Sequence, residues 1–453
     1  MFAEIFAPFL AQSPVSVMFR LVLERTLRAE RLEALFAATA VKQRPGELLF
    51  SSCVEALALV VAGTHKSLNA VYERRQAEWT VGVRSLYDKL AGIEPQVSER
   101  LVAETADELA ALVERLLPER TPLVPGYEVR IVDGNHLGGT EHRLGPLRGR
   151  GAAALPGQAL VVLDPERRLV RRMFAAEDAY VNERTLLPRV LEEVQAGQCW
   201  IADRNFSTCD FLAGIIDRGA TFVIRQHGQI RGKKVGESGP SAPLETGSAS
   251  EQELRIAVRE RELALRRVTV ELDKSTRDGA RKLHLLTNLP PSISAAEIAR
   301  LYRERWSIET AFMHLATVLR SEIKTLAYPP AALFGFGLGL VLYDVLRTLE
   351  AALRAALPEA TRERKFSLYY LGEEVAGVYR GMLIALEPSR WTALGELPEE
   401  AWRAALLEVA RRVAVQRYFT KPRSTKKPPP PRPPGPTVPH NSTYRLLNNY
   451  KPS

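Results

Sequence analysis

The chain has 453 residues, of which 46% are hydrophobic and 25% charged, which predicts a soluble globular protein large enough for more than one domain. Its net charge is +9, but residues 411–453 contain ten Lys and Arg and no Asp or Glu, so the other 410 residues carry −1 (+9 − 10). This basic segment predicts an anionic polymer as partner, and the alternative is a solvated tail that only keeps the protein in solution.

Cysteine spacing and hydropathy exclude several classes. The three cysteines (Cys53, Cys199 and Cys209) have no paired spacing, which favours reduced cytoplasmic thiols over a zinc site or disulfides. The N-terminus has no basic stretch, so we expect no signal peptide. Residues 325–343 are uncharged, but they contain two prolines and three glycines and charged residues follow at once, so we expect a buried core helix and no membrane partner.

The first 124 residues predict a helical region. Apolar residues recur at helical spacing from Leu21 onward, residues 47–61 form an apolar helix, and residues 98–117 form a long amphipathic one. Ser67 and Ser85 are predicted to cap two short helices. Several short helices in succession predict a DNA-binding region, although no sharp helix-turn-helix pattern marks it.

The pattern changes near Pro125, where strands and helices begin to alternate. The predicted elements are strands at 127–133, 158–163 and 169–174, a helix from Asn182 or Glu183 to about 196, a strand at 199–202, a helix at 208–218 and a strand at 221–225. Three strands followed by helix, strand, helix and strand is the order of a ribonuclease-H-like core. We therefore predict an α/β fold class, with this core in residues 125–226 and 291–350.

The remaining segments frame the core. Residues 227–290 lose the helix-strand alternation and predict a β-rich insertion rather than a continuation of the core. Ser294 and Glu297 form a capping box, and the helix it opens is predicted to run past Leu315. Residues 351–420 predict a helical C-terminal region, and residues 421–453 a basic Pro-rich tail that is extended and mobile over 426–439.

Three acidic residues stand where this topology would bring them together. Asp133 follows the apolar Ile131-Val132, Asp203 follows Ile201-Ala202, and Glu309 lies on the capped helix. Carboxylates are ligands of hard cations, and two Mg²⁺ (or Mn²⁺) ions roughly 3.5–4 Å apart serve phosphoryl transfer. Asp133 would bridge both ions, Asp203 would hold one and Glu309 the other. Either aspartate alone, at the end of a strand, would also fit an ordinary turn.

The acidic motifs and the stretch from Tyr302 to Glu309 resemble those of DDE transposases of bacterial insertion sequences. Tyr302, Arg305 and Glu309 match the Tyr-x2-Arg-x3-Glu-x6-Lys signature of the insertion-sequence-four (IS-four) family, and the segments VDGNHL (with Asp133) and IADRNF (with Asp203) match its other acidic motifs. The resemblance covers about residues 125–345. One position departs: Ala316 stands in place of the signature Lys, so Arg320 or Lys324 would have to substitute for it.

The resemblance implies a function. It implies an enzyme that binds the terminal inverted repeats of its element, cleaves double-stranded DNA with Mg²⁺ or Mn²⁺ and joins the ends to target DNA. It also implies a homodimer in the synaptic complex, and a bacterial cytoplasmic, nucleoid-associated location. Alternatives are a catalytically silent DNA-binding protein derived from a transposase, and a nuclease of the same fold without strand transfer.

Further residues are predicted to contact DNA. Tyr302 and Arg305 share the helix face of Glu309 and would grip phosphates, and the alternative is an ion pair of Arg305 with Glu309. Arg204 and Asn205 follow Asp203 at a helix entrance, where phosphate binds readily. Asn135 and His136 would line the cleft or stabilise its loop.

Aromatic residues complete the prediction. In the resembled family the insertion supplies an aromatic ring that stacks on a flipped base, but residues 227–292 contain no Phe, Trp or Tyr. Either another segment supplies the ring, or the enzyme does not form a DNA hairpin. Trp200 and Trp306 are both predicted to be core residues.

Overall fold

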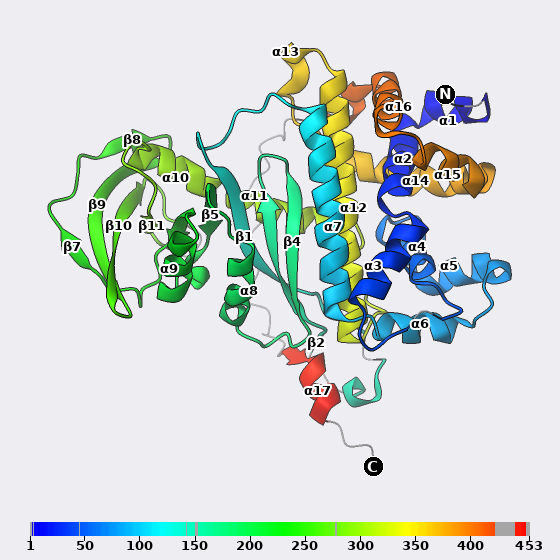
Figure 1. The fold of residues 1–453 in the computed structure, drawn as a ribbon, viewed down its shortest axis with the longest axis horizontal. Coiled ribbons are helices and arrows are strands. Elements are labelled where there is room, and N and C mark those ends of the chain that lie inside the picture. The colour runs from blue at the N-terminus through cyan, green and yellow to red at the C-terminus, as the bar shows by residue number, and fades with distance from the viewer. Residues whose placement is uncertain are drawn as a thin grey trace.

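A computed structural model describes residues 2, 4–44, 46–141, 143–149, 153–276, 279–421 and 440–449. The fold is mixed α/β, and a ten-stranded sheet runs through its left half, with helices gathered on the right (Figure 1). In this sheet the strands lie in the order β4-β3-β1-β5-β6-β11-β10-β9-β7, and β8 pairs with β9.

Five strands form the core half of the sheet. They are β1 (Glu128–His136), β3 (Gln158–Asp164), β4 (Leu169–Ala176), β5 (Gln198–Ala202) and β6 (Thr221–Arg225). The meander β1-β3-β4 is antiparallel, while β1, β5 and β6 are parallel to one another. This is the predicted ribonuclease-H-like order, and all five strands lie where the sequence places them. β1 differs by continuing three residues beyond Asp133.

Helices connect and cover these strands. The crossover from β4 to β5 contains η4 (Glu183–Leu186) and α8 (Leu187–Glu192), and α9 (Cys209–Asp217) joins β5 to β6. The long helices α7 (Pro95–Leu116) and α12 (Pro329–Ala356) lie side by side and pack on β4 (Figure 1). By length and composition α12 is apolar enough to cross a membrane, but 94% of its apolar window is buried inside the protein, as expected of a core helix.

The N-terminal and C-terminal helices intermingle in one helical body. The N-terminal elements are η1 (Glu4–Phe6), α1 (Ala7–Gln12), α2 (Pro14–Thr26), α3 (Ala29–Thr39), α4 (Phe50–Val61), α5 (Leu68–Arg75), η2 (Gln76–Glu78) and α6 (Val83–Ala91). The C-terminal elements are α13 (Glu359–Arg362), α14 (Leu368–Ala385), α15 (Pro388–Gly395), α16 (Glu399–Arg412) and η6 (Val415–Tyr418). Buried aromatic residues join the two sets: the rings of Phe6 and Trp391 lie 5.0 Å apart, and Trp402 Nε1 donates to Leu21 O at 3.3 Å.

The two predicted serine caps have different outcomes. Ser67 caps α5, because its side chain accepts the Ala70 N–H at 3.2 Å. The prediction for Ser85 is wrong: α6 already begins at Val83 after Gly82, so Ser85 lies inside the helix.

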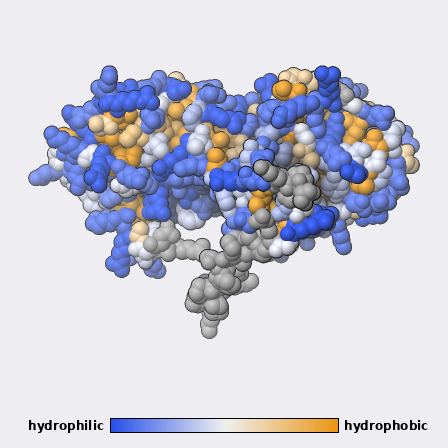
Figure 2. All heavy atoms as spheres, turned by 90° about the horizontal axis from the view of Figure 1, so that it is seen from below, coloured by the Kyte–Doolittle hydropathy of each residue, from blue (hydrophilic) through white to orange (hydrophobic). Residues whose placement is uncertain are grey.

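Figure 2 shows that hydrophilic side chains cover most of one face of the molecule, with apolar side chains in small scattered groups.

Residues 227–290 form a β-rich insertion between β6 and α10 (Ala295–Arg303), and its strands extend the core sheet. They contain β7 (Lys233–Val235), β8 (Ala242–Leu244), β9 (Gly247–Val258), β10 (Arg261–Leu272) and β11 (Lys282–Thr287). β11 pairs antiparallel with β6, with Leu286 opposite Ile224. The segment is β-rich and lies between β6 and α10, as predicted, and it is attached to the core because β11 pairs with the free edge of β6.

The end of the chain returns to the core. β12 (His440–Ser442) pairs in parallel with β2 (Ala153–Leu155), and α17 (Thr443–Asn449) packs against η3 (Gly145–Leu147). Asp178 accepts hydrogen bonds from Ser442 Oγ and Arg445 Nε, both at 2.7 Å. These residues belong to the segment predicted to be a tail. The stretch predicted to be extended and mobile, 426–439, lies outside the described residues.

Candidate active site

Two of the predicted acids lie at the same level on neighbouring parallel strands. The last residue pair that joins β1 to β5 is Val132 with Ala202, and Asp133 and Asp203 follow directly. β1 continues beyond Asp133 along β3, whereas β5 ends at Ala202. The sheet therefore opens between the two strands at the position of these carboxylates, which the sequence predicted from the apolar segments before them.

The third acid reaches the site from a helix that the sequence places only in part. The predicted capping box is present: Ser294 Oγ accepts the Glu297 N–H, and Glu297 Oε2 accepts the Ser294 N–H at 2.8 Å. The single long helix is wrong, since α10 (Ala295–Arg303) ends before α11 (Trp306–Thr317) begins. Between them the backbone makes tighter bonds to the third residue back, such as Arg305 N–H to Tyr302 O at 3.1 Å. Tyr302 and Glu309 consequently lie on different helices.

Arg305 stands between the carboxylates. Its Nη1 donates to Asp133 Oδ2 at 3.0 Å, and its Nη2 donates to Glu309 Oε1 at 2.6 Å. The side chains of Arg305 and Asp133 are 13% and 19% exposed, and that of Glu309 is 37% exposed. Nε of Arg305 is buried without a hydrogen-bond partner among the described residues. The ion pair of Arg305 with Glu309, predicted as an alternative, is thus present. The same guanidinium also binds Asp133 and so links the two carboxylates.

Burial and neighbouring charges shift the protonation equilibria here. Burial raises the pKa of Asp133 to about 7; Arg305 opposes this rise, and the nearby Asp203 and Glu183 add to it. Burial also raises the pKa of Tyr302 to about 12, so its phenol stays protonated at neutral pH. For Arg305, burial acts to lower the pKa, but Tyr302, Asp133 and Glu309 outweigh it and the net shift is upward.

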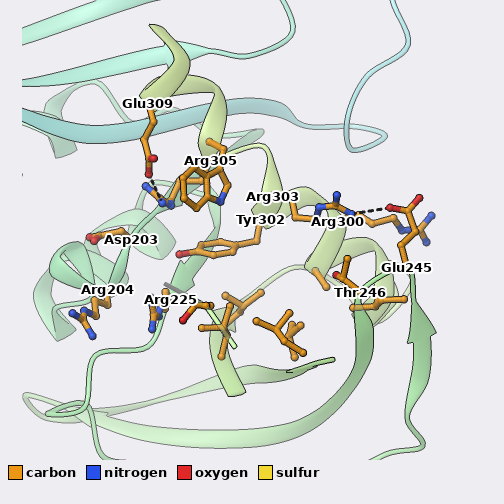
Figure 3. A pocket seen from close by; sticks show the side chains of 18 of the residues that line it. Asp203, Arg204, Arg225, Glu245, Thr246, Arg300, Tyr302, Arg303, Arg305 and Glu309 are labelled. Carbon is orange, nitrogen blue, oxygen red and sulfur yellow. Dashed lines mark hydrogen bonds and ion pairs between the residues drawn. The ribbon is translucent and has the colours of Figure 1, made fainter. Parts of the chain in front are cut away.

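A pocket of about 740 Å³ opens beside these residues (Figure 3). Asp203, Tyr302, Arg305 and Glu309 line one part of it, and apolar side chains of β10 and β11 line another. Four more arginines contribute to the wall: Arg204, Arg225, Arg300 and Arg303. The pocket therefore combines carboxylates, an apolar floor and an excess of guanidinium groups.

The two tryptophans have different outcomes. Trp200 is buried on β5, as predicted. Trp306 is 61% exposed and lines the pocket, so its prediction as a core residue is wrong. It is the first residue of α11 after the break, which turns its ring outward, and the Arg305 guanidinium lies 5.3 Å from the ring centroid.

The other predicted DNA-contacting residues scatter around the site. Asn205 does not line the pocket, and its side chain donates to Glu183. Asn135 hydrogen-bonds Glu322. His136 is exposed at the end of β1 and lines a second hollow that also includes His440.

Neither candidate for the missing signature Lys lines the pocket. Arg320 is held against the N-terminal helices, where its backbone N–H donates to Val61 O at 2.8 Å and its Nη1 lies 3.5 Å from His65 O. Lys324 is exposed, and its carbonyl accepts the Glu141 N–H at 2.9 Å. Ala316 is exposed on α11.

The sequence reasoning missed one acidic residue of the site, Glu183. This residue opens η4, and its charge acts on Asp133. The sequence marks it only as one of two candidate starts of a helix. Glu183 approaches Asp133 because the connection from β4 to β5 passes the site, and the spacing of neighbouring residues in the sequence does not reveal such a contact.

The residues fit a divalent metal by their chemistry. Asp133, Asp203 and Glu309 offer hard carboxylate oxygens, and Arg305 places a cationic group between two of them. In the described part of the chain, no three His, Cys, Asp or Glu groups are gathered closely enough to hold a metal ion as they stand. A metal held by Asp133 and Glu309 would therefore have to displace the Arg305 guanidinium from them.

Comparison with known proteins adds a family match. Residues 124–334 match the family model described as "Transposase DDE domain". No curated protein matches the chain in sequence. Among solved structures, the cryo-EM structure of the piggyBac transposase synaptic complex with hairpin DNA is similar with a TM-score of 0.39 and 12% identity, covering 87% of this chain and 84% of that one. That likeness is too low to bear on the site. The part of the chain that carries Asp133, Asp203 and Glu309 is thus similar to a transposase DDE domain.

Proposed function

We propose that the protein is a DNA transposase of the insertion-sequence-four (IS-four) family. In this proposal it binds the terminal inverted repeats of its element and catalyses metal-dependent strand cleavage and strand transfer. The observation that carries it is the position of Asp133 and Asp203 directly after the last pair joining β1 and β5, with Glu309 linked to Asp133 through Arg305. The match of residues 124–334 to transposase DDE domains supports the same reading.

Asp133, Asp203 and Glu309 are the residues that would hold two Mg²⁺ or Mn²⁺ ions. Ions of this kind, when bound, stabilise the attacking and leaving oxygens of a phosphodiester. The raised pKa of Asp133 favours a cation there, because a positive charge offsets the cost of ionising a buried carboxyl group.

The neighbouring side chains would bind and orient the DNA backbone. Tyr302 keeps its proton at neutral pH and can donate a hydrogen bond to a phosphate oxygen. Arg204, Arg225 and Arg300 line the same pocket and offer guanidinium groups, which bind phosphates in bidentate fashion. Once freed from the carboxylates, Arg305 would join them.

Trp306 is the residue that would supply an aromatic ring near the cleaved end. Its ring is exposed, lines the pocket and follows Arg305 directly. Stacking of a base on such a ring contributes roughly 1–3 kcal/mol. Residues 227–292 contain no aromatic residue, so the ring would come from α11 instead. The enzyme could then still form a DNA hairpin.

The proposal includes a homodimer in the synaptic complex, contacts of the N-terminal helices with DNA, and a cytoplasmic, nucleoid-associated location. A catalytically silent DNA-binding protein is the second candidate. Ala316 in place of the signature Lys, and the guanidinium of Arg305 between two of the acids, favour it. A nuclease would share the cleavage step but would not join ends.

One gel assay separates these functions. Duplex DNA carrying the terminal sequences of the element that encodes the chain is incubated with the full chain, a target plasmid and Mg²⁺ or EDTA. We expect Mg²⁺-dependent cleavage and joining, and loss of both to background in Asp133→Ala, Asp203→Ala and Glu309→Ala, with end binding retained. Glu192→Ala, an exposed acid on α8, is the control. Cleavage without joining would identify a nuclease, and end binding without cleavage a silent DNA-binding protein.

A further inference from the structure

Glu183 lies where the connection between β4 and β5 returns past the site. It is the first residue of η4, and the turn is fixed by Asn182, whose side chain accepts the Arg184 N–H at 3.0 Å. The Glu183 side chain is half-buried. Its place is therefore set by a capped turn rather than by a free loop.

Glu183 and the next residue hold the turn that follows Asp203. The Asn205 side-chain amide donates to Glu183 Oε2, and Arg184 Nε donates to the Asn205 carbonyl at 2.8 Å. The backbone N–H of Asn205 in turn donates to Asp203 Oδ1 at 2.6 Å. A chain of hydrogen bonds thus leads from Glu183 to the carboxylate of Asp203.

The same carboxyl group of Glu183 packs on the backbone next to Asp133. A Cβ atom on Gly134 would lie 2.7 Å from the Glu183 carboxyl carbon and closer still to Oε1, so a side chain there would displace the Glu183 carboxyl group. The Gly134 N–H donates to Asp133 Oδ1 at 2.9 Å. Glu183 consequently contacts the β1 backbone beside Asp133 and the turn that follows Asp203.

We propose that Glu183 is a positioning residue that sets the spacing of Asp133 and Asp203, by joining Asn205 on one side to the backbone of Gly134 on the other. The inference rests on the proposed function, since it assigns Glu183 to the same metal-dependent site. Glu183 acts through Asn205 and Gly134, so its carboxyl shape and acceptor oxygen matter more than its charge. Partners of this kind, which orient metal ligands, typically affect metal affinity or activity by about 10–100-fold.

The experiment measures Mn²⁺ binding by calorimetry on the full chain without DNA, followed by the gel assay of cleavage. Glu183→Ala should weaken Mn²⁺ binding and slow cleavage by about 10–100-fold, with DNA-end binding unchanged. Glu183→Gln keeps the shape and one acceptor oxygen, so it should stay within about threefold of the wild type. Glu192→Ala, in the same connection, controls for loss of an acidic side chain.

Two further variants test the route of the effect. Asn205→Ala should weaken Mn²⁺ binding as Glu183→Ala does, and the double variant should be no weaker than either single one, because both remove the same link. Gly134→Ala should displace the Glu183 carboxyl and give the same defect. Thermal unfolding of each variant shows whether it is folded, and if Gly134→Ala is not, the Asn205 cycle decides.

The outcomes are distinct. Wild-type Mn²⁺ affinity in Glu183→Ala would overturn the inference while leaving the proposed function standing. A defect in Glu183→Gln as large as in Glu183→Ala would also overturn it, because the charge of Glu183 would then be what matters. If the wild type bound Mn²⁺ no better than Asp133→Ala does, the proposed function would fail, and this inference with it.

Discussion

Replacing Arg305 by Met should lower the free energy of unfolding of the metal-free protein and raise its affinity for a divalent metal. In the metal-free protein, Arg305 is the cation that faces both Asp133 and Glu309. Met retains most of the apolar stem but removes the charge. A divalent ion bound to the variant would meet no competing guanidinium group, and it would replace the charge that was lost.

The magnitude follows from the exposure of the two pairs. The bond to Asp133 joins side chains that are 13% and 19% exposed, and a hydrogen bond between charged groups contributes about 1.5–3 kcal/mol. Glu309 is 37% exposed, so solvent screening reduces its pair to about 0.5–1 kcal/mol. We therefore expect the free energy of unfolding in EDTA to fall by about 2–4 kcal/mol. If the bound ion recovers all of this coupling, the affinity for Mn²⁺ should rise by about 30- to 700-fold.

Chemical unfolding in EDTA and in MnCl₂, together with calorimetric titration, measures both effects. Arg204→Met is the matched control, because Arg204 is exposed and lines the same pocket. Cleavage should be lost in Arg305→Met although metal binds more tightly, since the phosphate-binding group is gone. Unchanged stability in EDTA combined with unchanged or weaker Mn²⁺ binding would refute the reasoning.

Four other predictions concern two effects of pH, one buried glutamate and the basic run. With the pKa of Asp133 raised to about 7 by burial, a proton competes with the metal below that pH, so Mn²⁺ affinity should rise about tenfold from pH 6 to pH 8, and a flat profile would show that the carboxyl is already ionised. Because of the same raised pKa, the folded metal-free protein binds more protons than the unfolded chain between about pH 4 and 7. Its free energy of unfolding should therefore fall as the pH rises from about 4 to 7, which unfolding measured at several pH values would show. Burial acts to raise the pKa of Glu350, but three arginines hold it at about 2, so Glu350→Gln should cost about 3–5 kcal/mol in thermal unfolding at pH 7, and an unchanged midpoint would contradict this. Replacing the four Lys and Arg of residues 422–432 by Ser should flatten the slope of log DNA affinity against log salt by up to about 3.6, and an unchanged slope would reduce this run to a solubilising segment.

The sequence predicted the core of the fold because its signals there are local. Apolar runs mark β3, β5 and β6, the serine-glutamate capping box marks α10, and each of the two aspartates follows an apolar pair, Ile131-Val132 within β1 and Ile201-Ala202 at the end of β5. Parallel pairing of β1 with β5 then brings Asp133 and Asp203 to the same level, which a topological rule captures without coordinates. The parts that failed depend on contacts between distant segments.

The break between α10 and α11 shows this limit. No Pro or Gly stands between Arg303 and Trp306, so helical spacing runs through without interruption. The turn at Glu304 and Arg305 is accompanied by the ion pairs of Arg305 with Asp133 and Glu309, and one of these joins residues 172 positions apart. The outward position of Trp306 depends on that turn. The pairing of β11 with β6 and the contacts of Glu183 are equally long-range, and composition alone carries no trace of them.

Because β12 pairs with β2, the basic run of residues 422–439 is attached to the folded protein at both ends and not at one end alone. Folded structure stands at both of its ends: the Thr420 N–H donates to Lys365 O at 2.8 Å, and His440 pairs with Ala153. A segment of 18 residues spans at most about 60 Å when fully extended, whatever its conformation. Under the proposed function, this length limits how far the four basic residues of 422–432 can be from DNA bound at the site, and so sets a lower bound on their effective concentration there. Replacing Asp178, which holds Ser442 and Arg445, would release the second attachment and lower that effective concentration without removing any of the charges.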